Sequence, residues 1–177
     1  MDRRSSIKTL IILSAGTALL PSCLQEEKKP SVSVKNFKIS GNDEDIVSAL
    51  SDTIIPRGKT PGAKDIGAYQ FALMMIDDCY APDMQQKFTK GLKEFDDFSK
   101  KTTMKSWGKA VTAERNEVLK AIENKKNIPG NAALFYNNIK ELTLEAFTQS
   151  KYYLTNVQVY ELVPGKFYGC VPVKKAS

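Results

Sequence analysis

The side chains best suited to chemistry are three cysteines and two pairs of adjacent aspartates. Cys23, Cys79 and Cys170 lie too far apart in the sequence for the ligand spacing of a zinc or iron–sulfur site. The chain has no histidine, which excludes Ser-His and Cys-His nucleophile pairs and the C-x-x-C-H haem motif. Neither common glycine-rich nucleotide loop is present. The composition therefore predicts a chain with no catalytic, cofactor-binding or metal-binding residues of its own.

The two aspartate pairs, Asp77-Asp78 and Asp96-Asp97, are the best candidates for acid–base catalysis. Both pairs fall within expected helices, where neighbouring side chains project about 100° apart. The two carboxylates of a pair cannot readily reach one substrate atom from these directions. We interpret both pairs as part of the solvated helix surface. Among the possible functions, an enzymatic one therefore has the least support from the residues.

The first 23 residues have the pattern of an export signal that ends in a lipid-attachment cysteine. Arg3 and Arg4 form a charged start, residues 9–20 form an apolar core, and residues 20–23 (LPSC) match a bacterial lipobox. The core is shorter than the roughly 20 residues that a helix needs to cross a bilayer. We expect residues 1–22 to be a signal peptide and Cys23 to carry lipid. The mature protein would then be a membrane-anchored lipoprotein on the periplasmic side.

The start of this signal resembles the twin-arginine export motif, R-R-x-F-L-K. Arg3, Arg4 and Lys8 match, with isoleucine in the leucine position, whereas Ser6 departs from the usual phenylalanine. An ordinary secretory signal with two chance arginines is the alternative. The twin-arginine route moves proteins that are already folded, often with a cofactor inserted or a partner bound. A chain without a cofactor site would have reason to use it if a partner held the cofactor.

If Cys23 carries lipid, an even pair of cysteines remains for an oxidising compartment. We expect Cys79 and Cys170 to form a disulfide, which would close a loop of about 92 residues and contribute roughly 4–5 kcal/mol in the chain-entropy model. Two buried free thiols are the alternative.

The formal charge of the whole chain is +6 at pH 7. It falls to +4 when the signal is removed, because Arg3, Arg4, Lys8 and Asp2 are lost. The lysines are scattered among acidic residues, so we expect no nucleic-acid partner. A weak, unspecific attraction to anionic lipid headgroups is compatible with this charge.

Apolar periodicity predicts a mainly α fold with a single domain over residues 43–177. The expected helices cover about 43–54, 64–79, 82–99, 112–125 and 131–149. Asn42 or Asp43 is expected to cap the first of these helices, and Pro82 to begin the third. Residues 23–42 are polar and predict a flexible tether between the lipid and the domain, with a short strand as the alternative.

The segment after residue 151 differs in character from the helices before it. Five aromatic residues lie within it, and residues 157–163 could form a strand. An irregular, partly extended tail of this composition either packs on its own bundle or offers aromatic anchors to another protein.

Two blocks, residues 50–80 and 139–172, carry a resemblance to a known family. The motifs are DTIIP at 52–56, TPGA at 60–63, LTLE at 142–145, VPG at 163–165 and YGCVP at 168–172. In this order and spacing they resemble the small subunit (subunit 3, or gamma) of gluconate 2-dehydrogenase-type complexes.

The resemblance implies a non-catalytic accessory subunit. Its partner would be a large flavoprotein of the glucose–methanol–choline (GMC) oxidoreductase class, which holds FAD and oxidises a sugar or sugar acid. Electrons would pass to a cytochrome c subunit or another acceptor. The small subunit would carry the export signal, bring the bound flavoprotein across the membrane and stabilise it, and Cys23 would tether this version to the bilayer. The competing hypothesis is a stand-alone membrane-tethered lipoprotein that acts as a binding or scaffold module.

Overall fold

A computed structural model describes residues 28–124, 128–158, 163, 165 and 169–170. These residues form six α-helices and one short 3₁₀ helix, and no strand is found among them. The elements are α2 (Gly41–Ile54), α3 (Ala68–Cys79), α4 (Pro82–Thr103), η1 (Trp107–Lys109), α5 (Thr112–Glu123), α6 (Gly130–Thr148) and α7 (Lys151–Asn156). The predicted mainly helical fold is therefore confirmed. No helix in the described part of the chain is long and apolar enough to cross a membrane.

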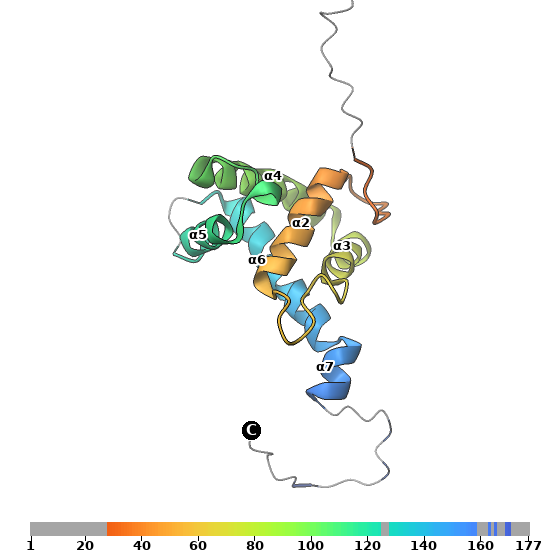
Figure 1. Ribbon diagram of the computed structural model, residues 1–177. Helices are drawn as coiled ribbons and strands as arrows, with labels where there is room; N and C mark the ends of the chain where they lie inside the picture. Colours follow the sequence, from red (N-terminus) through yellow and green to blue (C-terminus); the bar gives the residue numbers. More distant parts are fainter. Residues whose placement is uncertain (1–27, 125–127, 159–162, 164, 166–168, 171–177) are drawn as a thin grey trace, which may run out of the picture.

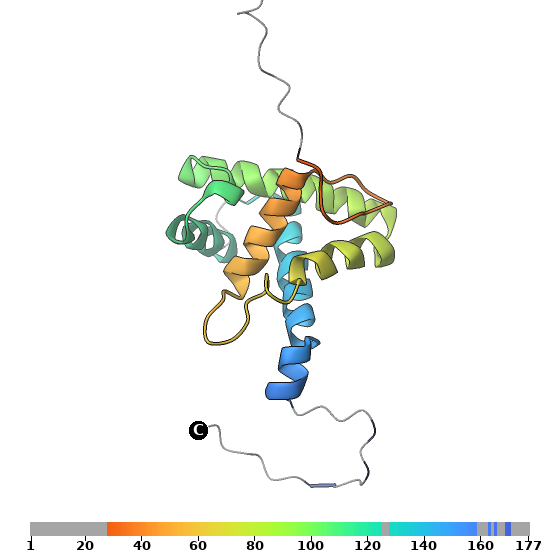
Figure 2. The ribbon, with the colours of Figure 1, turned by 45° about the vertical axis from the view of Figure 1, so that its right-hand side comes forward.

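Helix α6 is the central element of the bundle (Figure 1). It packs most extensively on α4, which lies across one end of the bundle, and also on α3 and α2. Helix α5 packs against α4, and α7 extends from the C-terminal end of α6. Figure 2 shows α7 at the opposite end of the bundle from α4 in a second view.

The core between α4 and α6 is aromatic. The ring of Phe135 on α6 lies 5.1 Å from that of Phe88 and 5.2 Å from that of Phe95, measured between centroids. Phe95 in turn meets the ring of Trp107 edge-on at 4.9 Å. All four side chains are fully buried. The stripe of apolar residues that predicted α4 therefore forms the core, and it also holds η1 in place.

Gly91 allows α4 and α6 to approach at backbone distance. A Cβ atom at this position would lie 2.2 Å from the carbonyl oxygen of Asn131 and 2.9 Å from the Cβ of Phe135. Real Cβ atoms do not approach other atoms so closely, so no other residue fits here without movement of one helix.

The helix boundaries differ from the predicted ones where a cap or a turn intervenes. Ser40, and not Asn42 or Asp43, caps α2: its side chain accepts from the Asp43 N–H, and the Asp43 carboxylate accepts from the Ser40 N–H. Helix α3 begins at residue 68 because Gly67 adopts a left-handed conformation with φ of +71°.

Residues 28–40, which we call the N-terminal strap, pack on the helical domain. The sequence predicted a flexible tether over residues 23–42; its described part is irregular and packed, and the alternative strand is not formed there. Val32 is buried, and the ring of Phe37 lies 5.8 Å from that of Phe88 in the core. The strap also closes on itself, because the Gly41 N–H donates to the Lys28 carbonyl at 2.6 Å.

Two buried carboxylates hold the strap. Glu44 on α2 accepts hydrogen bonds from the backbone N–H and the hydroxyl of Ser31. Asp77 on α3 accepts from the backbone N–H groups of Lys35 and Asn36 at 2.8 and 2.7 Å. These bonds satisfy backbone donors that have no partner within a strand or helix, which explains why an irregular segment stays in place.

The C-terminal part contains the short helix α7, which the sequence pattern did not predict. Ser150 caps this helix, and Tyr153 packs edge-on against Phe147 of α6 at 5.9 Å. Tyr153 thus packs on its own bundle. Val157 lies in a turn directly after α7 and not in a strand, whereas residues 159–162 lie outside the described residues.

Candidate functional site

A polar groove of about 770 Å³ lies between α2, the C-terminal half of α4 and the segment around η1. Its lining carries four acidic and four basic side chains: Asp43, Asp45, Asp52, Asp96, Lys64, Lys100, Lys109 and Arg115. The groove is the first candidate for a functional site, so the state of its charged groups decides what it can do.

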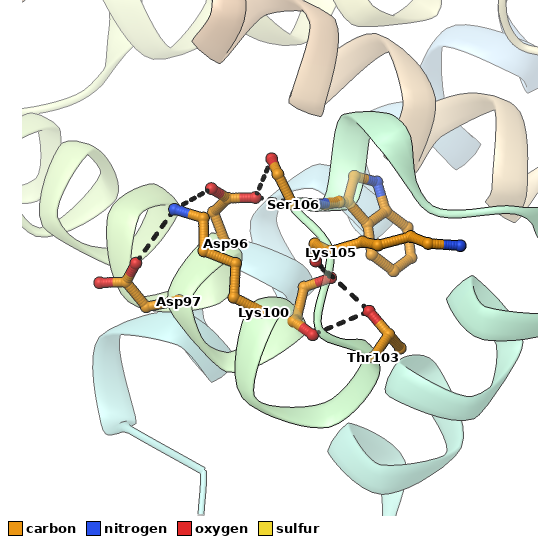
Figure 3. Close-up of polar contacts among 8 residues, drawn as sticks. Asp96, Asp97, Lys100, Thr103, Lys105 and Ser106 are labelled. Atoms are coloured by element: carbon orange, nitrogen blue, oxygen red, sulfur yellow. Dashed lines mark hydrogen bonds and ion pairs between the residues drawn. The ribbon is translucent and has the colours of Figure 1, made fainter.

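Asp96 is the most constrained of these groups (Figure 3). One carboxylate oxygen accepts from the Ser106 hydroxyl at 2.7 Å and from the Trp107 backbone N–H at 2.8 Å. The other oxygen lies 2.8 Å from the Lys100 ammonium, which also reaches Asp97 at 3.3 Å. Asp96 therefore fastens the segment after α4 onto the helix.

The neighbouring segment is fixed by a second set of hydrogen bonds. The hydroxyls of Ser99 and Thr103 both donate to the Lys105 carbonyl, at 3.2 and 3.3 Å (Figure 3). Met104 ends α4 in a left-handed conformation with φ of +59°. The chain thus turns sharply here and brings Trp107 back over the core.

Burial by itself would raise the pKa of Asp96, but the hydrogen bonds from Lys100, Ser106 and Trp107 outweigh it and lower the pKa below its ordinary value. A carboxylate of this kind stays ionised at neutral pH and has its acceptor positions occupied. It is poorly suited to act as a general acid or base, for which a pKa near the working pH is needed. Asp96 is therefore a structural group.

Asp96→Asn is expected to lower the free energy of unfolding at pH 7 by about 1–3 kcal/mol, because hydrogen bonds to a charged group are lost. The pKa of Asp96 is lower in the folded state, so the carboxylate stabilises fully above the unfolded value of about 3.9. This stabilisation is lost as the pH falls through the folded-state pKa. Urea unfolding at pH 7 and at about pH 3 should show the deficit shrinking in acid.

Asp97→Asn is the matched control, because Asp97 is exposed and contacts the same ammonium of Lys100. An exposed ion pair contributes little, so this change should stay within about 0.5 kcal/mol. A deficit equal in both variants, or independent of pH, would contradict the role assigned to Asp96.

Arg115 lines the groove and lies over the ring of Trp107, which is buried beneath it. The guanidinium carbon of Arg115 lies 5.7 Å from the Trp107 ring centroid, and its Nη2 donates to the Gly108 carbonyl at 3.4 Å. Burial lowers the pKa of Arg115, while Asp52 opposes this effect. Within the described residues, neither Nε of Arg115 nor Nε1 of Trp107 has a hydrogen-bond partner.

The structure divides each predicted aspartate pair between the interior and the surface. Asp77 and Asp96 are only 5% and 9% exposed, whereas Asp78 and Asp97 face solvent. The interpretation of both pairs as solvated surface is therefore wrong for one member of each. Within the described residues, no group of acidic or cysteine side chains is placed to bind a metal ion.

Cys79 and Cys170 are free and exposed, so the predicted disulfide is not formed in the structure, and the thiols are not buried either. Cys79 ends α3, whereas Cys170 lies beyond α7 in a segment of which six residues are described. The residues predicted for export and lipidation (Arg3, Arg4, Lys8 and Cys23) lie outside the described residues.

Exposed apolar side chains suggest where another protein could bind. Met74 on α3 is 53% exposed and Leu144 on α6 is 46% exposed, and these two helices pack against each other. Tyr80 follows α3, and its pKa is raised by burial and by Glu141 and Glu145 of α6. We call the exposed surface of these two helices the α3–α6 face. Contiguous apolar patches at a surface often mark protein contacts, and these two side chains lie on helices that pack together.

Comparison with known proteins identifies the domain. A family model described as gluconate 2-dehydrogenase subunit 3 matches residues 42–165. The chain belongs to the gluconate 2-dehydrogenase subunit 3 family. The match runs from the second residue of α2 through α7, so the gluconate 2-dehydrogenase subunit 3 domain of this chain is the helical bundle described above. The N-terminal strap lies before the matched region. No curated protein and no solved structure matches the chain.

Family membership makes the chain a subunit of a dehydrogenase complex. It also confirms the resemblance found in the two sequence blocks. Sequence reasoning missed Trp107, Arg115 and the buried role of Asp96, which are brought together only by the turn after α4.

Proposed function

We propose that this chain is the non-catalytic accessory subunit of an FAD-dependent sugar or sugar-acid dehydrogenase of the GMC class. It binds the flavoprotein, accompanies it during export and stabilises it. The family match over residues 42–165 is the observation that carries this proposal. The groove supports it, since Asp96 is committed to hydrogen bonds that fix the backbone. FAD would belong to the large subunit, and a cytochrome c subunit or another acceptor would take the electrons.

The N-terminal sequence supports the export and tethering parts of the proposal. Arg3, Arg4 and Lys8 fit a twin-arginine signal, and Cys23 fits a lipid-attachment site. A flavoprotein that folds around FAD in the cytoplasm needs a route for folded cargo, which this signal would supply. After export, lipid on Cys23 would hold the complex on the periplasmic side of a membrane.

The α3–α6 face is where we place the flavoprotein. Met74 and Leu144 give it apolar anchors, and burial of such side chains contributes most at the centre of an interface. Two other exposed apolar residues, Met104 and Val111, flank η1 at a separate site and provide a matched comparison.

Co-purification tests the proposal. The tagged chain should bring down a yellow, FAD-bearing protein in comparable molar amount. Met74→Glu combined with Leu144→Glu is expected to reduce the recovered flavin by about tenfold or more, because buried unpaired charges oppose binding. Met104→Glu combined with Val111→Glu adds the same charge and should leave the flavin unchanged.

The results separate the two parts of the proposal. Recovery of a monodisperse monomer without flavoprotein would refute the accessory role and favour the stand-alone binding module, for which the polar groove is the binding site. Full recovery of flavin with both double variants would leave the accessory role standing but place the flavoprotein elsewhere.

A further inference from the structure

The strap and the facing part of α4 form a surface that is rich in lysine. The strap carries Lys28, Lys29, Lys35 and Lys38 and has no acidic residue. Helix α4 adds lysines at 87, 90 and 93, and this spacing of three places them along one side of the helix. All seven lysines are exposed.

Two adjoining hollows of about 750 and 440 Å³ lie along this surface. Both are lined by Phe37 and Lys38 of the strap and by Thr89 and Lys93 of α4. They therefore form one continuous feature, which we call the lysine groove. Lys29 lines its first part and Lys90 its second.

One acidic residue, Asp43, lines the groove, and its carboxylate accepts hydrogen bonds from the backbone N–H and the hydroxyl of Ser40. The other two described carboxylates that contact the strap backbone do not line the groove. The carboxylates of Glu44 and Asp77 are buried beneath the strap, where they accept hydrogen bonds from its backbone. Their charge is thus committed to holding the strap, and the outward side keeps its lysines.

The ion pairs of the surface lysines leave a positive charge at the centre of the lysine groove. Lys28, Lys87 and Lys90 reach Asp45, Asp83 and Glu94 at 2.6, 3.5 and 3.9 Å. Among the described residues, no ion pair involves Lys29, Lys38 or Lys93. Within the described part of the chain, these three ammonium groups thus have no carboxylate partner and can meet an anion from outside it.

We infer that the lysine groove rests on the anionic headgroups of a phospholipid bilayer and orients the subunit on the membrane. The position of the strap supports a bilayer as the occupant. Lys28 lies five positions after Cys23, so lipid on Cys23 keeps Lys28 within about 18 Å of the bilayer surface. Lysines held so close to an anionic surface are attracted to it, with a strength that falls off over about 8 Å.

The inference rests on the proposed function for the nearness of the bilayer, but the charge of the groove does not depend on it. It also fixes an orientation. The strap and α4 lie at one end of the bundle and α7 at the other in both views (Figures 1 and 2). The α7 end would then point away from the membrane.

Vesicle binding tests the inference without any lipid on the protein. The mature chain from residue 23, carrying Cys23→Ser, is sedimented with vesicles of phosphatidylglycerol and phosphatidylcholine and with vesicles of phosphatidylcholine alone. It should bind the first and not the second, and added salt should weaken the binding. Combined Lys29→Glu, Lys38→Glu and Lys93→Glu substitutions should reduce binding by about tenfold or more.

The matched control replaces three exposed lysines outside the lysine groove, at positions 64, 109 and 120, with glutamate. It changes the net charge by the same amount. It should keep most of the binding, and circular dichroism should show equal helix content in both variants. Equal losses would overturn the inference, because net charge alone would then explain binding. So would failure of the parent chain to bind anionic vesicles.

A different occupant would give a different pattern. Loss of flavoprotein recovery in the groove variant with vesicle binding unchanged would assign the groove to an acidic protein surface and overturn the inference. The vesicle assay contains neither a lipidated cysteine nor a flavoprotein. Its failure is therefore distinguishable from a failure of the proposed accessory function, which co-purification measures.

Discussion

Phe135→Ala is expected to lower the free energy of unfolding by about 3–5 kcal/mol, as truncation of a fully buried phenylalanine does. Phe135 contacts both Phe88 and Phe95 from the opposite helix. Its removal leaves a cavity that these rings cannot close without moving α4, and α4 also carries η1 through Phe95 and Trp107. The loss should therefore spread beyond the site of substitution.

Urea unfolding followed by circular dichroism measures this loss. Trp107 is the single tryptophan of the chain and is buried beside Phe95, so its fluorescence reports on the same core. Leu144→Ala on the same helix is the control, because Leu144 is 46% exposed and should lose less than about 1 kcal/mol. Similar losses in the two variants would show that the aromatic core does not hold the bundle together.

Gly91→Ala is expected to destabilise the chain by about 1–3 kcal/mol, the usual cost of forcing extra atoms into a packed core. The added methyl group would lie 2.2 Å from the backbone carbonyl of Asn131, which cannot rotate away as a side chain can. Alanine favours a helix over glycine by about 1 kcal/mol, so the measured loss already includes this opposing gain.

Gly130→Ala provides the comparison, since a methyl group there meets nothing within 4 Å at the first residue of α6. It should be neutral or slightly stabilising in the same unfolding experiment. If Gly91→Ala were neutral as well, α4 and α6 would not touch at backbone distance in solution.

The helices could be predicted because their apolar stripes face one core. Phe88 and Phe95 in α4, and Phe135 and Ile139 in α6, recur with helical spacing and are all buried. The ends were less predictable. Met104 and Gly67 set them through left-handed conformations, and the sequence gives only a weak signal for such a turn at a methionine.

The buried aspartates carried a signal that spacing alone could have revealed. Asp96 follows Leu92 by four residues, and Asp77 follows Leu73 by four, so each lies on the side of its helix that faces the core. Their neighbours Asp78 and Asp97 lie about 100° away and reach solvent. The spacing could not show which distant groups donate hydrogen bonds to each buried carboxylate.

The strap was unpredictable for the same reason. Its apolar residues alternate only roughly, which does not fix a strand, so groups distant in the sequence decide where it packs. Glu44 and Asp77 supply these groups from α2 and α3, which the folded bundle brings to one side of the strap. Trp107 and Arg115 depend likewise on the turn that ends α4.

The closure of the strap at Lys28 has a mechanical consequence. The Lys28 carbonyl accepts from the Gly41 N–H, and its ammonium lies 2.6 Å from the Asp45 carboxylate on α2. These two contacts form a clasp that joins the start of the strap to the start of α2. Tension applied to the chain therefore passes through the clasp and not along the strap. A pull from the N-terminal side would thus load the first turn of α2 directly, and the strap would stay slack until the clasp at Lys28 breaks.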